Sequence, residues 1–397
     1  MTIANLDLSS AVVLGAGLNG LGVIRSLAIG GVETFLVDSD TTKIAYRSKF
    51  AHKKVFKNIN SPELIPELIK LGKVLDTDQF SDVGGNKPVL FLTEEASLNI
   101  VLQHRQQLEE HFTIPIAASD LILDLMDKAK FQQLAEQHHA PIPKSAVISK
   151  ESDVRRELGD FPFPAALKPI SKHKAYSRNF KKAYKITSLT ELIERCRQIF
   201  SEIPGQEMIL QQWIEGSDSN IYFCLQNIAP DGRLVSSFCG RKIRSWPTRV
   251  GGTASCTNAT EHIEELTETT YKFFSDVGYH GIGGIEYKLD DNSGKLLMIE
   301  PTVGRTDLQH EITTLCGVHQ LLEVFLLANN EEFTQTRQKD QSIVWYDPKP
   351  DQWAAEQSGI KGYPKDAKKY SAYFRWNDMN PGISRFIQLV KNRLKRK

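Results

Sequence analysis

The pattern of hydrophobic and polar positions divides the chain into two kinds of structure. Near the N-terminus, an apolar strand pattern at 11–14 is followed at once by a glycine-rich segment and then by an apolar stretch of helical period. Further strand patterns occur at 33–37 and 89–92, and a polar helix is expected at roughly 95–111. Strands that alternate with helices favour a parallel sheet. We therefore predict a small α/β domain over residues 1–120.

The rest of the chain has a different pattern. Between 165 and 310, short strand patterns follow one another with turn residues between them, which is typical of α+β structure with antiparallel hairpins. The expected strands are 165–168, 208–212, 222–226, 234–240, 282–288 and 296–301, with helices at 119–137, 188–200 and 260–276. We predict a second domain over 121–335, with lobes of about 121–208 and 209–335, and a C-terminal extension over 336–397.

Composition excludes several classes of protein. The chain has 397 residues, with 49 Lys+Arg against 48 Asp+Glu, and this near-neutral charge argues against a dedicated nucleic-acid-binding protein. The five cysteines include no C-x-x-C pair, so they predict neither a disulfide framework nor a zinc site. The most apolar run, 321–328, is too short to cross a bilayer, and the first residues lack the features of a signal peptide. We predict a cytoplasmic enzyme.

The glycine-rich segment has two interpretations. Gly15, Gly17, Gly20 and Gly22 follow a strand pattern, and Asp38 lies 23 residues after Gly15. This is the pattern of a dinucleotide-binding turn, in which glycines let the backbone approach an anion at a helix N-terminus. It would make the protein an NAD(P)-dependent oxidoreductase. The other interpretation is a tight turn that holds another anion, or none, and no later segment is similar to the catalytic half of a dehydrogenase.

The segment 281–302 predicts a β-hairpin that presents two carboxylates. The polar stretch 290–294 is a strong turn signal between two apolar runs. With the turn centred on Ser293, Glu286 and Glu300 are each seven residues away and lie opposite each other. Opposed residues have Cβ atoms roughly 4.5–5.5 Å apart, where like charges are destabilising. A bound Mg²⁺ would remove that repulsion; the alternative is a solvated face, and a one-residue slip would reverse either face.

Together with upstream segments, this hairpin resembles the ATP-grasp superfamily of ligases. The matching segments are Asp127–Lys128 with the HAPIP that follows, Ala166–Pro169, Ile209–Asp218, Gly283–Glu286 and Ile299–Arg305. The resemblance covers roughly residues 1–330. It implies an N-terminal Rossmann-like (pre-ATP-grasp) domain followed by a two-lobed ATP-grasp domain. Within the superfamily, Gly240–Pro247 and Gly304–Asp307 resemble the branch that contains D-aspartate ligase and related carboxylate–amine ligases.

The resemblance also implies roles for individual residues at an ATP site. Lys128 and Lys168 would contact the phosphates, and Asp218 would accept the ribose hydroxyls. The residues expected around adenine are Gln211, Gln212, Trp213 and Ile214. Taken without the resemblance, the lysines are ordinary surface residues, 211–214 is a buried strand, and Asp218 is the cap of a turn.

The same resemblance implies the metal-binding and catalytic residues. Glu286 and Glu300 would hold Mg²⁺, while Thr302 stands where family members commonly have Asn, which puts a second Mg²⁺ site in question. Arg305 would stabilise the acyl phosphate and the tetrahedral intermediate. Lys242 and Arg244 occupy alternate positions of a predicted strand and are expected to share a face, with Lys242 favoured for the phosphates.

The resemblance thus implies an ATP-dependent carboxylate–amine (or thiol) ligase that forms an acyl phosphate and releases ADP and phosphate. Its cofactors would be ATP and Mg²⁺, with Mn²⁺ as a substitute. Its substrates would be a small carboxylate and an amine, because relatives act on cell-wall precursors, peptides or surface glycans. The alternatives are the NAD(P)-dependent oxidoreductase and, because of Thr302, a nucleotide-binding module without turnover. The oligomeric state cannot be read from the sequence.

The chain ends in a basic amphipathic pattern. Apolar and basic residues recur at helical spacing at Arg385, Phe386, Ile387, Val390, Lys391, Arg393 and Leu394, before a final Lys-Arg-Lys. Such a helix usually packs on its own protein with the basic side solvated, and this is the primary interpretation. The alternative is a helix that lies on an anionic membrane surface.

Overall fold

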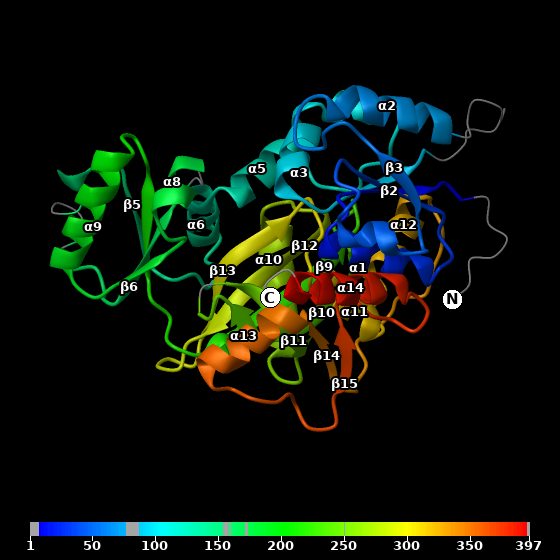
Figure 1. Ribbon diagram of the computed structural model, residues 1–397. Coiled ribbons are helices and arrows are strands. Elements are labelled where there is room, and N and C mark those ends of the chain that lie inside the picture. Colours follow the sequence, from blue (N-terminus) through cyan, green and yellow to red (C-terminus); the bar gives the residue numbers. More distant parts are fainter. Residues whose placement is uncertain are drawn as a thin grey trace.

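The computed structural model describes residues 8–76, 87–152, 154, 158, 160–170, 174–249 and 251–394. Within these residues the strands form three sheets, with helices packed between and around them (Figure 1). This mixture of a parallel sheet with antiparallel sheets agrees with the predicted combination of α/β and α+β structure.

The N-terminal sheet is entirely parallel, with the strand order β3-β2-β1-β4. Its elements are β1 (Ala11–Leu14), α1 (Leu18–Ala28), β2 (Thr34–Asp38), η1 (Ile44–Arg47), β3 (His52–Val55), α2 (Leu64–Leu75), β4 (Val89–Leu92), α3 (Glu95–Gln103) and α4 (Arg105–Leu108). The strands predicted at 11–14 and 89–92 are confirmed. The single helix predicted at 95–111 is two helices, because His104 leaves the helical backbone conformation. Strand β3 was not predicted, since all four of its residues are exposed and no alternation marks it.

The largest sheet has seven strands in the order β13-β12-β9-β10-β11-β14-β15. They are β9 (Ile221–Ile228), β10 (Leu234–Trp246), β11 (Gly252–Asn258), β12 (Gly281–Leu289), β13 (Leu296–Val303), β14 (Ile343–Tyr346) and β15 (Lys368–Ser371). The helices around it are α10 (Ile263–Asp276), α11 (His310–Leu315), α12 (Gln320–Ala328) and α13 (Pro348–Ser358). Both faces are buried: Tyr222 joins the core that contains α10, while its neighbour Phe223 joins the core that contains α11.

Two predicted boundaries change in the structure. The expected extension at 336–397 supplies β14 and β15, so its first part completes the large sheet. The smaller antiparallel sheet, ordered β5-β8-β6-β7, consists of β5 (Ser145–Ile148), β6 (Ala165–Pro169), β7 (Tyr184–Ile186) and β8 (Met208–Gln212). Because β8 pairs with β5 and β6, the first lobe extends to Gln212 and does not end at 208.

The smaller sheet forms a lobe of its own, at the left of Figure 1. Helix α9 (Leu189–Glu202) packs on it, and residues such as Leu167, Leu192 and Leu210 form a separate hydrophobic core. Helix α8 (Lys174–Asn179) lies in the same lobe. Helices α5 (Ser119–Met126) and α6 (Lys128–Gln137) connect this lobe to the rest of the molecule.

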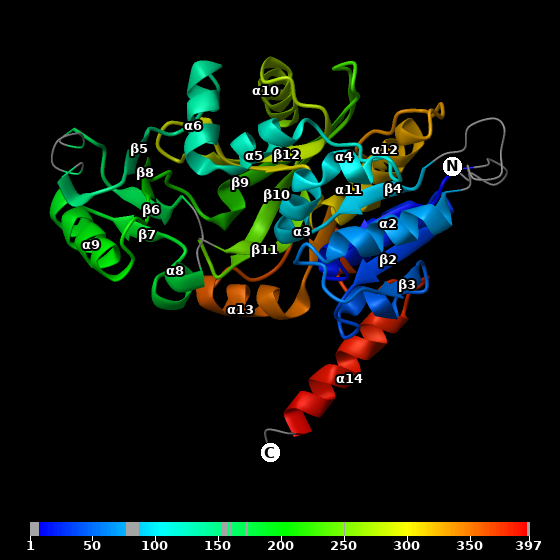
Figure 2. The same cartoon turned by 90° about the horizontal axis from the view of Figure 1, so that it is seen from above.

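The C-terminal helix predicted from the basic amphipathic pattern is present as α14 (Asn380–Leu394). It packs near its beginning against η1, and Figure 2 shows it extending away from the body of the molecule. The final Lys-Arg-Lys of the predicted pattern lies outside the described residues. Among the residues that are described, no helix is both long enough and apolar enough to cross a membrane.

Candidate active site

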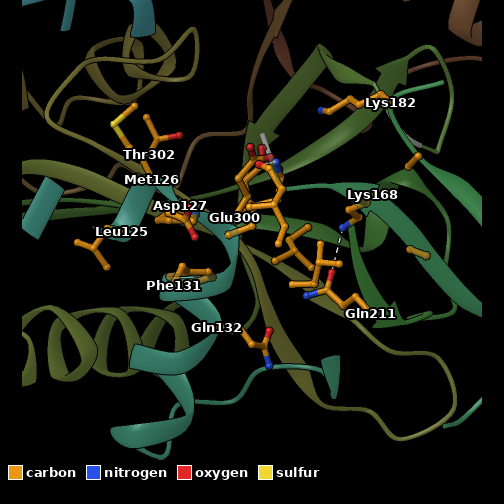
Figure 3. A pocket seen from close by; sticks show the side chains of 18 of the residues that line it. Leu125, Met126, Asp127, Phe131, Gln132, Lys168, Lys182, Gln211, Glu300 and Thr302 are labelled. Carbon is orange, nitrogen blue, oxygen red and sulfur yellow. Dashed lines mark hydrogen bonds between the residues drawn. The ribbon is translucent and has the colours of Figure 1, made fainter. Parts of the chain in front are cut away.

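A cleft of about 480 Å³ lies between the smaller and the larger antiparallel sheets. This is the size of a small-molecule site. It is lined by most of the residues that the sequence singles out: Lys128, Lys168, Gln211, Gln212, Trp213, Ile214, Lys242, Glu286, Glu300, Thr302 and Arg305. Figure 3 shows side chains from both sheets and from α6 facing this space. Residues that are distant in the sequence are therefore brought to one place.

The two glutamates of the predicted hairpin lie directly opposite each other. Glu286 on β12 is paired with Glu300 on β13, as predicted. The next pair is Tyr287 with Met298, so Ile299 has no partner and forms a β-bulge. Both glutamates thus line the cleft from neighbouring strands.

Glu286 is held in place by two side chains. The Nζ atom of Lys242 lies 2.7 Å from Glu286 Oε1, and Gln309 Nε2 donates a hydrogen bond of 3.0 Å to the same oxygen. Gln309 also donates to Thr253 Oγ1 at 2.9 Å. Burial is the largest single effect and disfavours the Lys242 ammonium, but the charge and hydrogen bond of Glu286, together with the charges of Asp307 and Glu300, raise the pKa of Lys242 overall. Lys242 therefore stays a cation inside the cleft.

Gln309 is a site residue that sequence reasoning missed. It is 3% exposed and lies just before α11, four residues after Arg305. A polar residue at the start of a helix has many possible roles, and no periodicity marks this one. Only the packing of α11 against the sheet brings its amide to Glu286.

Lysines from the smaller sheet and from the start of α6 line one part of the cleft. Lys168 Nζ donates to Gln211 Oε1 at 2.9 Å (Figure 3), and Lys128 Nζ donates to the carbonyl oxygens of Pro169 and Ile170, each at 3.1 Å. Burial lowers the pKa of Lys168, Glu300 opposes this shift and neighbouring lysines add to it, so that the pKa is about 8. A bound polyanion would relieve this repulsion between like charges.

Residues 211–214, which connect the smaller sheet to the larger and are called the hinge below, bring an aromatic side chain and backbone groups to the cleft. The ring of Trp213 has Lys185 Nζ 4.5 Å and Lys288 Nζ 5.4 Å from its centroid. The backbone N–H groups of Gln212 and Trp213 already donate to the carbonyl oxygens of Lys144 and Pro164. A base bound here would therefore pair with the hinge carbonyl groups or with the N–H of Ile214.

Asp218 lies outside the cleft lining, contrary to the expected ribose contact. It is 6% exposed, and its oxygens accept hydrogen bonds from the backbone N–H groups of Ser245 at 3.1 Å and Arg249 at 2.8 Å. Its carboxylate therefore anchors the segment that follows β10. Arg249 itself lines the cleft, so Asp218 acts on the site through the backbone that it fixes.

Arg244 also lies outside the cleft, and the prediction that it shares a face with Lys242 is wrong. Lys242 is opposite Cys256 and Arg244 opposite Ser255, so the strand contains a register shift between them. Arg244 forms a bidentate pair with Asp351 on α13, with distances of 2.7 and 2.8 Å. This side chain holds α13 to the sheet.

The polar groups and the space of the glycine-rich turn are taken up by residues of the N-terminal domain itself. Asp38 is fully buried and accepts hydrogen bonds from the Ala16 backbone N–H at 2.7 Å and from Lys43 Nζ at 2.8 Å. Gly15 has φ +106°, and a Cβ atom on Gly20 would lie 2.0 Å from the carbonyl oxygen of Gly15. These contacts account for the turn, since the carboxylate that completes the dinucleotide-binding pattern already has partners within the protein.

The turn does, however, contact the loop that carries Arg305. Asn19, at the beginning of α1, donates to the carbonyl oxygens of Thr93 at 2.9 Å and Thr306 at 2.8 Å. None of Gly15, Gly17, Gly20 or Gly22 is among the residues that line the cleft. The turn therefore contacts the loop that carries Arg305 but does not line the cleft.

Comparisons with known proteins identify relatives of this chain. No protein-family model matches the chain. Over 352 residues, it is 25% identical to D-aspartate ligase from Enterococcus faecium (strain Aus0004), covering 84% of this chain and 81% of that protein. Over 240 residues, it is 23% identical to D-alanine–D-alanine ligase from Pseudomonas putida (strain GB-1), covering 57% of this chain and 73% of the relative.

Solved structures show the same fold. The crystal structure of N5-carboxyaminoimidazole synthetase from Staphylococcus aureus complexed with ADP superposes with a TM-score of 0.63 at 13% identity, and covers 87% of this chain and 84% of that chain. Sequence relatives and architecture agree with the resemblance that the motifs indicated: this chain is similar to ATP-grasp enzymes of the carboxylate–amine ligase group.

Proposed function

We propose that this enzyme phosphorylates a substrate carboxylate with ATP and joins the resulting acyl phosphate to an amine. One observation carries the proposal. A single cleft is lined by the aromatic ring of Trp213, several lysines, two opposed glutamates and an arginine, which are the kinds of group that a nucleotide and its reacting γ-phosphate require. The closed glycine turn, with Asp38 already paired, gives the oxidoreductase alternative no comparable support.

The nucleotide would lie between the sheets, with its adenine against the hinge and its phosphates against the lysines. Trp213 and Ile214 supply apolar surface, and the remaining hinge backbone groups supply hydrogen bonds. Lys168 lines the cleft from the smaller sheet, Lys128 from the start of α6, and Lys242 from the larger sheet. Flexible ammonium groups suit phosphates that move during transfer.

The donor set at the far end fits Mg²⁺. Glu286 and Glu300 offer carboxylate oxygens from opposed positions, and Thr302 offers a hydroxyl two residues further on. The described residues contain no group of three or more His, Cys, Asp or Glu side chains that would bind a metal alone. Mg²⁺ commonly uses one or two carboxylates with substrate phosphates and water. When bound, the ion neutralises phosphate charge and eases phosphoryl transfer.

The protein's own cations would stabilise the two reacting intermediates. In the first step, a carboxylate oxygen bonds to the γ-phosphorus and the bond to ADP breaks. In the second, the amine nitrogen bonds to the carbonyl carbon, a proton leaves the nitrogen, and phosphate departs. Arg305 and Lys242 both line the cleft, and either cation would stabilise the negative charge that develops in both steps. Arg305 is fixed by a hydrogen bond of 3.0 Å from its guanidinium to the carbonyl oxygen of Thr306.

The named relatives indicate which substrates to test first. The relatives are ligases of D-aspartate and of D-alanine with D-alanine. We propose that this enzyme likewise joins an amino acid to an amine on another amino acid or on a peptide-like precursor. The D- and L-forms of aspartate and alanine are therefore the first carboxylates to screen, each with a panel of amines.

Two measurements test the proposal. Thermal unfolding with Mg-ATP, Mg-ADP, NAD⁺ and NADP⁺ in parallel should show stabilisation by the adenine nucleotides alone; a ligand at 100 times its Kd stabilises by about 2.7 kcal/mol. With a turned-over carboxylate labelled with ¹⁸O, one labelled oxygen should appear in the released phosphate. Stabilisation only by NAD⁺ or NADP⁺, or unlabelled phosphate, would contradict the proposed function.

A further inference from the structure

The end of the chain exposes an unusual amount of apolar surface. Of the seventeen large hydrophobic side chains that are exposed in the described residues, nine lie between 374 and 394. They are Phe374, Trp376, Met379, Ile383, Phe386, Ile387, Leu389, Val390 and Leu394. Trp376, just before α14, is 85% exposed. The primary interpretation, that this helix buries its apolar side on its own protein, is therefore wrong for most of its length.

The exposed side chains of α14 form one stripe. Ile383, Phe386, Ile387, Val390 and Leu394 are spaced i, i+3, i+4, i+7 and i+11, so they lie on one face of the helix. Figure 2 shows that the helix leaves the body of the molecule soon after its beginning. The stripe is thus available to a partner along the outer part of α14.

The charged residues of α14, and of the three residues after it in the sequence, all have one sign. Residues 380–397 contain six Lys or Arg residues and no Asp or Glu. Lys391 is exposed within the helix itself. A second copy of the chain is a poor partner for this face, since two such helices would bring twelve positive charges together. The chemistry that suits the face is apolar and negatively charged.

A second basic segment lies at the base of the same helix. Helix α14 packs against η1, which leads into the edge strand β3. Residues 43–57 contain six Lys or Arg residues and no Asp or Glu, and Arg47, Lys49, Lys53 and Lys54 are exposed. Strand β3 and α14 lie on the same side of the molecule in Figure 2. Two acid-free segments, distant in the sequence, therefore adjoin each other.

We propose that α14, together with η1 and β3, forms a surface that docks on an anionic lipid bilayer. The apolar stripe enters the interface between headgroups and acyl chains, and the surrounding lysines and arginines contact the phosphates of the lipids. Neither segment lines the active-site cleft, so docking leaves the cleft open. The enzyme then works at a membrane surface without spanning it.

Vesicle flotation of the full-length protein tests this surface. Vesicles of phosphatidylcholine with about 30% phosphatidylglycerol should carry the protein upward, and vesicles of phosphatidylcholine alone should not. Two variants of α14 are compared with the wild type: the single variant Lys391→Glu and the double variant Phe386→Ser with Val390→Ser. Each should lower the partition coefficient of the protein onto the anionic vesicles by about tenfold or more. Raising the salt concentration should weaken binding of the wild type.

A matched variant on another helix provides the control. Lys73→Glu with Val74→Ser changes an exposed basic and an exposed apolar residue of α2, outside the proposed surface, and should bind vesicles like the wild type. Equal unfolding temperatures would show that all variants fold. Absence of binding to anionic vesicles, or unchanged binding by the α14 variants, overturns the proposal. So does a dimer, seen by sedimentation velocity, that the α14 variants abolish while vesicles leave the wild type unbound.

Discussion

Glu286 and Glu300 lie opposite each other because Ile299 is bulged out of the ladder between β12 and β13. With the register of the pair Tyr287–Met298 continued unbroken, Glu286 would be opposite Ile299, and Glu300 would be displaced from it. The bulge therefore sets the spacing of the two carboxylates. Bulges are common beside active sites, where they redirect side chains.

Replacing one carboxylate by its amide should stop the reaction and leave the fold intact. Glu300→Gln keeps the size of the side chain but removes the charge that would bind Mg²⁺. We expect the rate of Mg-dependent phosphate release to fall by about 100-fold or more. Glu264→Gln, at an exposed position of α10, is the control. Wild-type turnover by Glu300→Gln would refute the metal assignment.

Gln309 should control how well the enzyme uses magnesium. Gln309→Leu retains most of the side-chain volume but removes the hydrogen bond to Glu286. Hydrogen bonds that orient metal ligands typically contribute 10–100-fold to metal affinity. We therefore expect about tenfold more Mg²⁺ at half-maximal activity, with a smaller change in the limiting rate. Thr253→Val removes the other partner of Gln309 and should have less effect; an equal effect would mean that Gln309 acts only through packing.

Nucleotide binding should depend on pH through Lys168. Its pKa of about 8 lies below the usual value of 10.5, so the ammonium is present below pH 8 and is lost above it. A bound phosphate favours the ammonium, so binding takes up a proton near pH 8. We expect the Kd for ADP, measured by calorimetry without divalent cation, to rise between pH 7.5 and about 9.5. Lys168→Arg keeps its charge throughout this range and should give a flatter curve; equal slopes would exclude Lys168 as the cause.

Arg244 should matter for stability and little for nucleotide binding. Its side chain is 2% exposed and paired with that of Asp351, which is 7% exposed. Removing one partner of a buried ion pair leaves an uncompensated charge and costs about 3–5 kcal/mol. Arg244→Ala should therefore lower the unfolding temperature, while the Kd for Mg-ADP at 15 °C stays near that of the wild type. Lys272→Ala, which breaks an exposed pair with Asp276, is the control and should change the unfolding temperature little. An unchanged unfolding temperature together with lost affinity for Mg-ADP would instead show that Arg244 takes part in nucleotide binding.

Local patterns explain which features the sequence could predict. The strand, glycine turn and helix at 11–28 and the hairpin at 281–303 are formed by neighbouring residues, so composition and period mark them. The contacts of Gln309 with Glu286 and of Arg244 with Asp351 join separate elements and leave no local signal. Bulges are equally hidden, since they shift a strand's faces without changing its apolar residues.

The hairpin shows how a correct prediction can rest on an incomplete reason. A turn centred on Ser293 gives the observed pairing of Glu286 with Glu300. Nearer the turn, however, Leu289 pairs with Leu296, so the hairpin is centred there half a residue before Ser293. The extra residue in the bulge, Ile299, shifts the register so that Glu300 and not Ile299 is opposite Glu286. The sequence thus predicted the pairing of the two glutamates but not the β-bulge that produces it.

The glycine turn gives a last prediction, because its four glycines are not equivalent. A Cβ atom on Gly17 would meet nothing within 4 Å, whereas one on Gly20 would lie 2.0 Å from the Gly15 carbonyl oxygen. The structure therefore predicts that Gly17→Ala is tolerated. In a turn that binds a dinucleotide, by contrast, replacing any of the glycines would be expected to weaken binding. Gly20→Ala must move the turn backbone and should lower the unfolding temperature clearly.

Both glycine variants should still bind Mg-ADP when folded, because the turn lies outside the cleft lining. The measurement is the Kd at a temperature where Gly20→Ala is fully folded, with Gly17→Ala as the matched control. The contact of Asn19 with Thr306 would transmit a displacement of α1 to the Arg305 loop, so turnover of Gly20→Ala should fall more than its nucleotide affinity. Loss of Mg-ADP binding in Gly17→Ala would instead locate the nucleotide at the glycine turn and refute the site proposed between the two sheets.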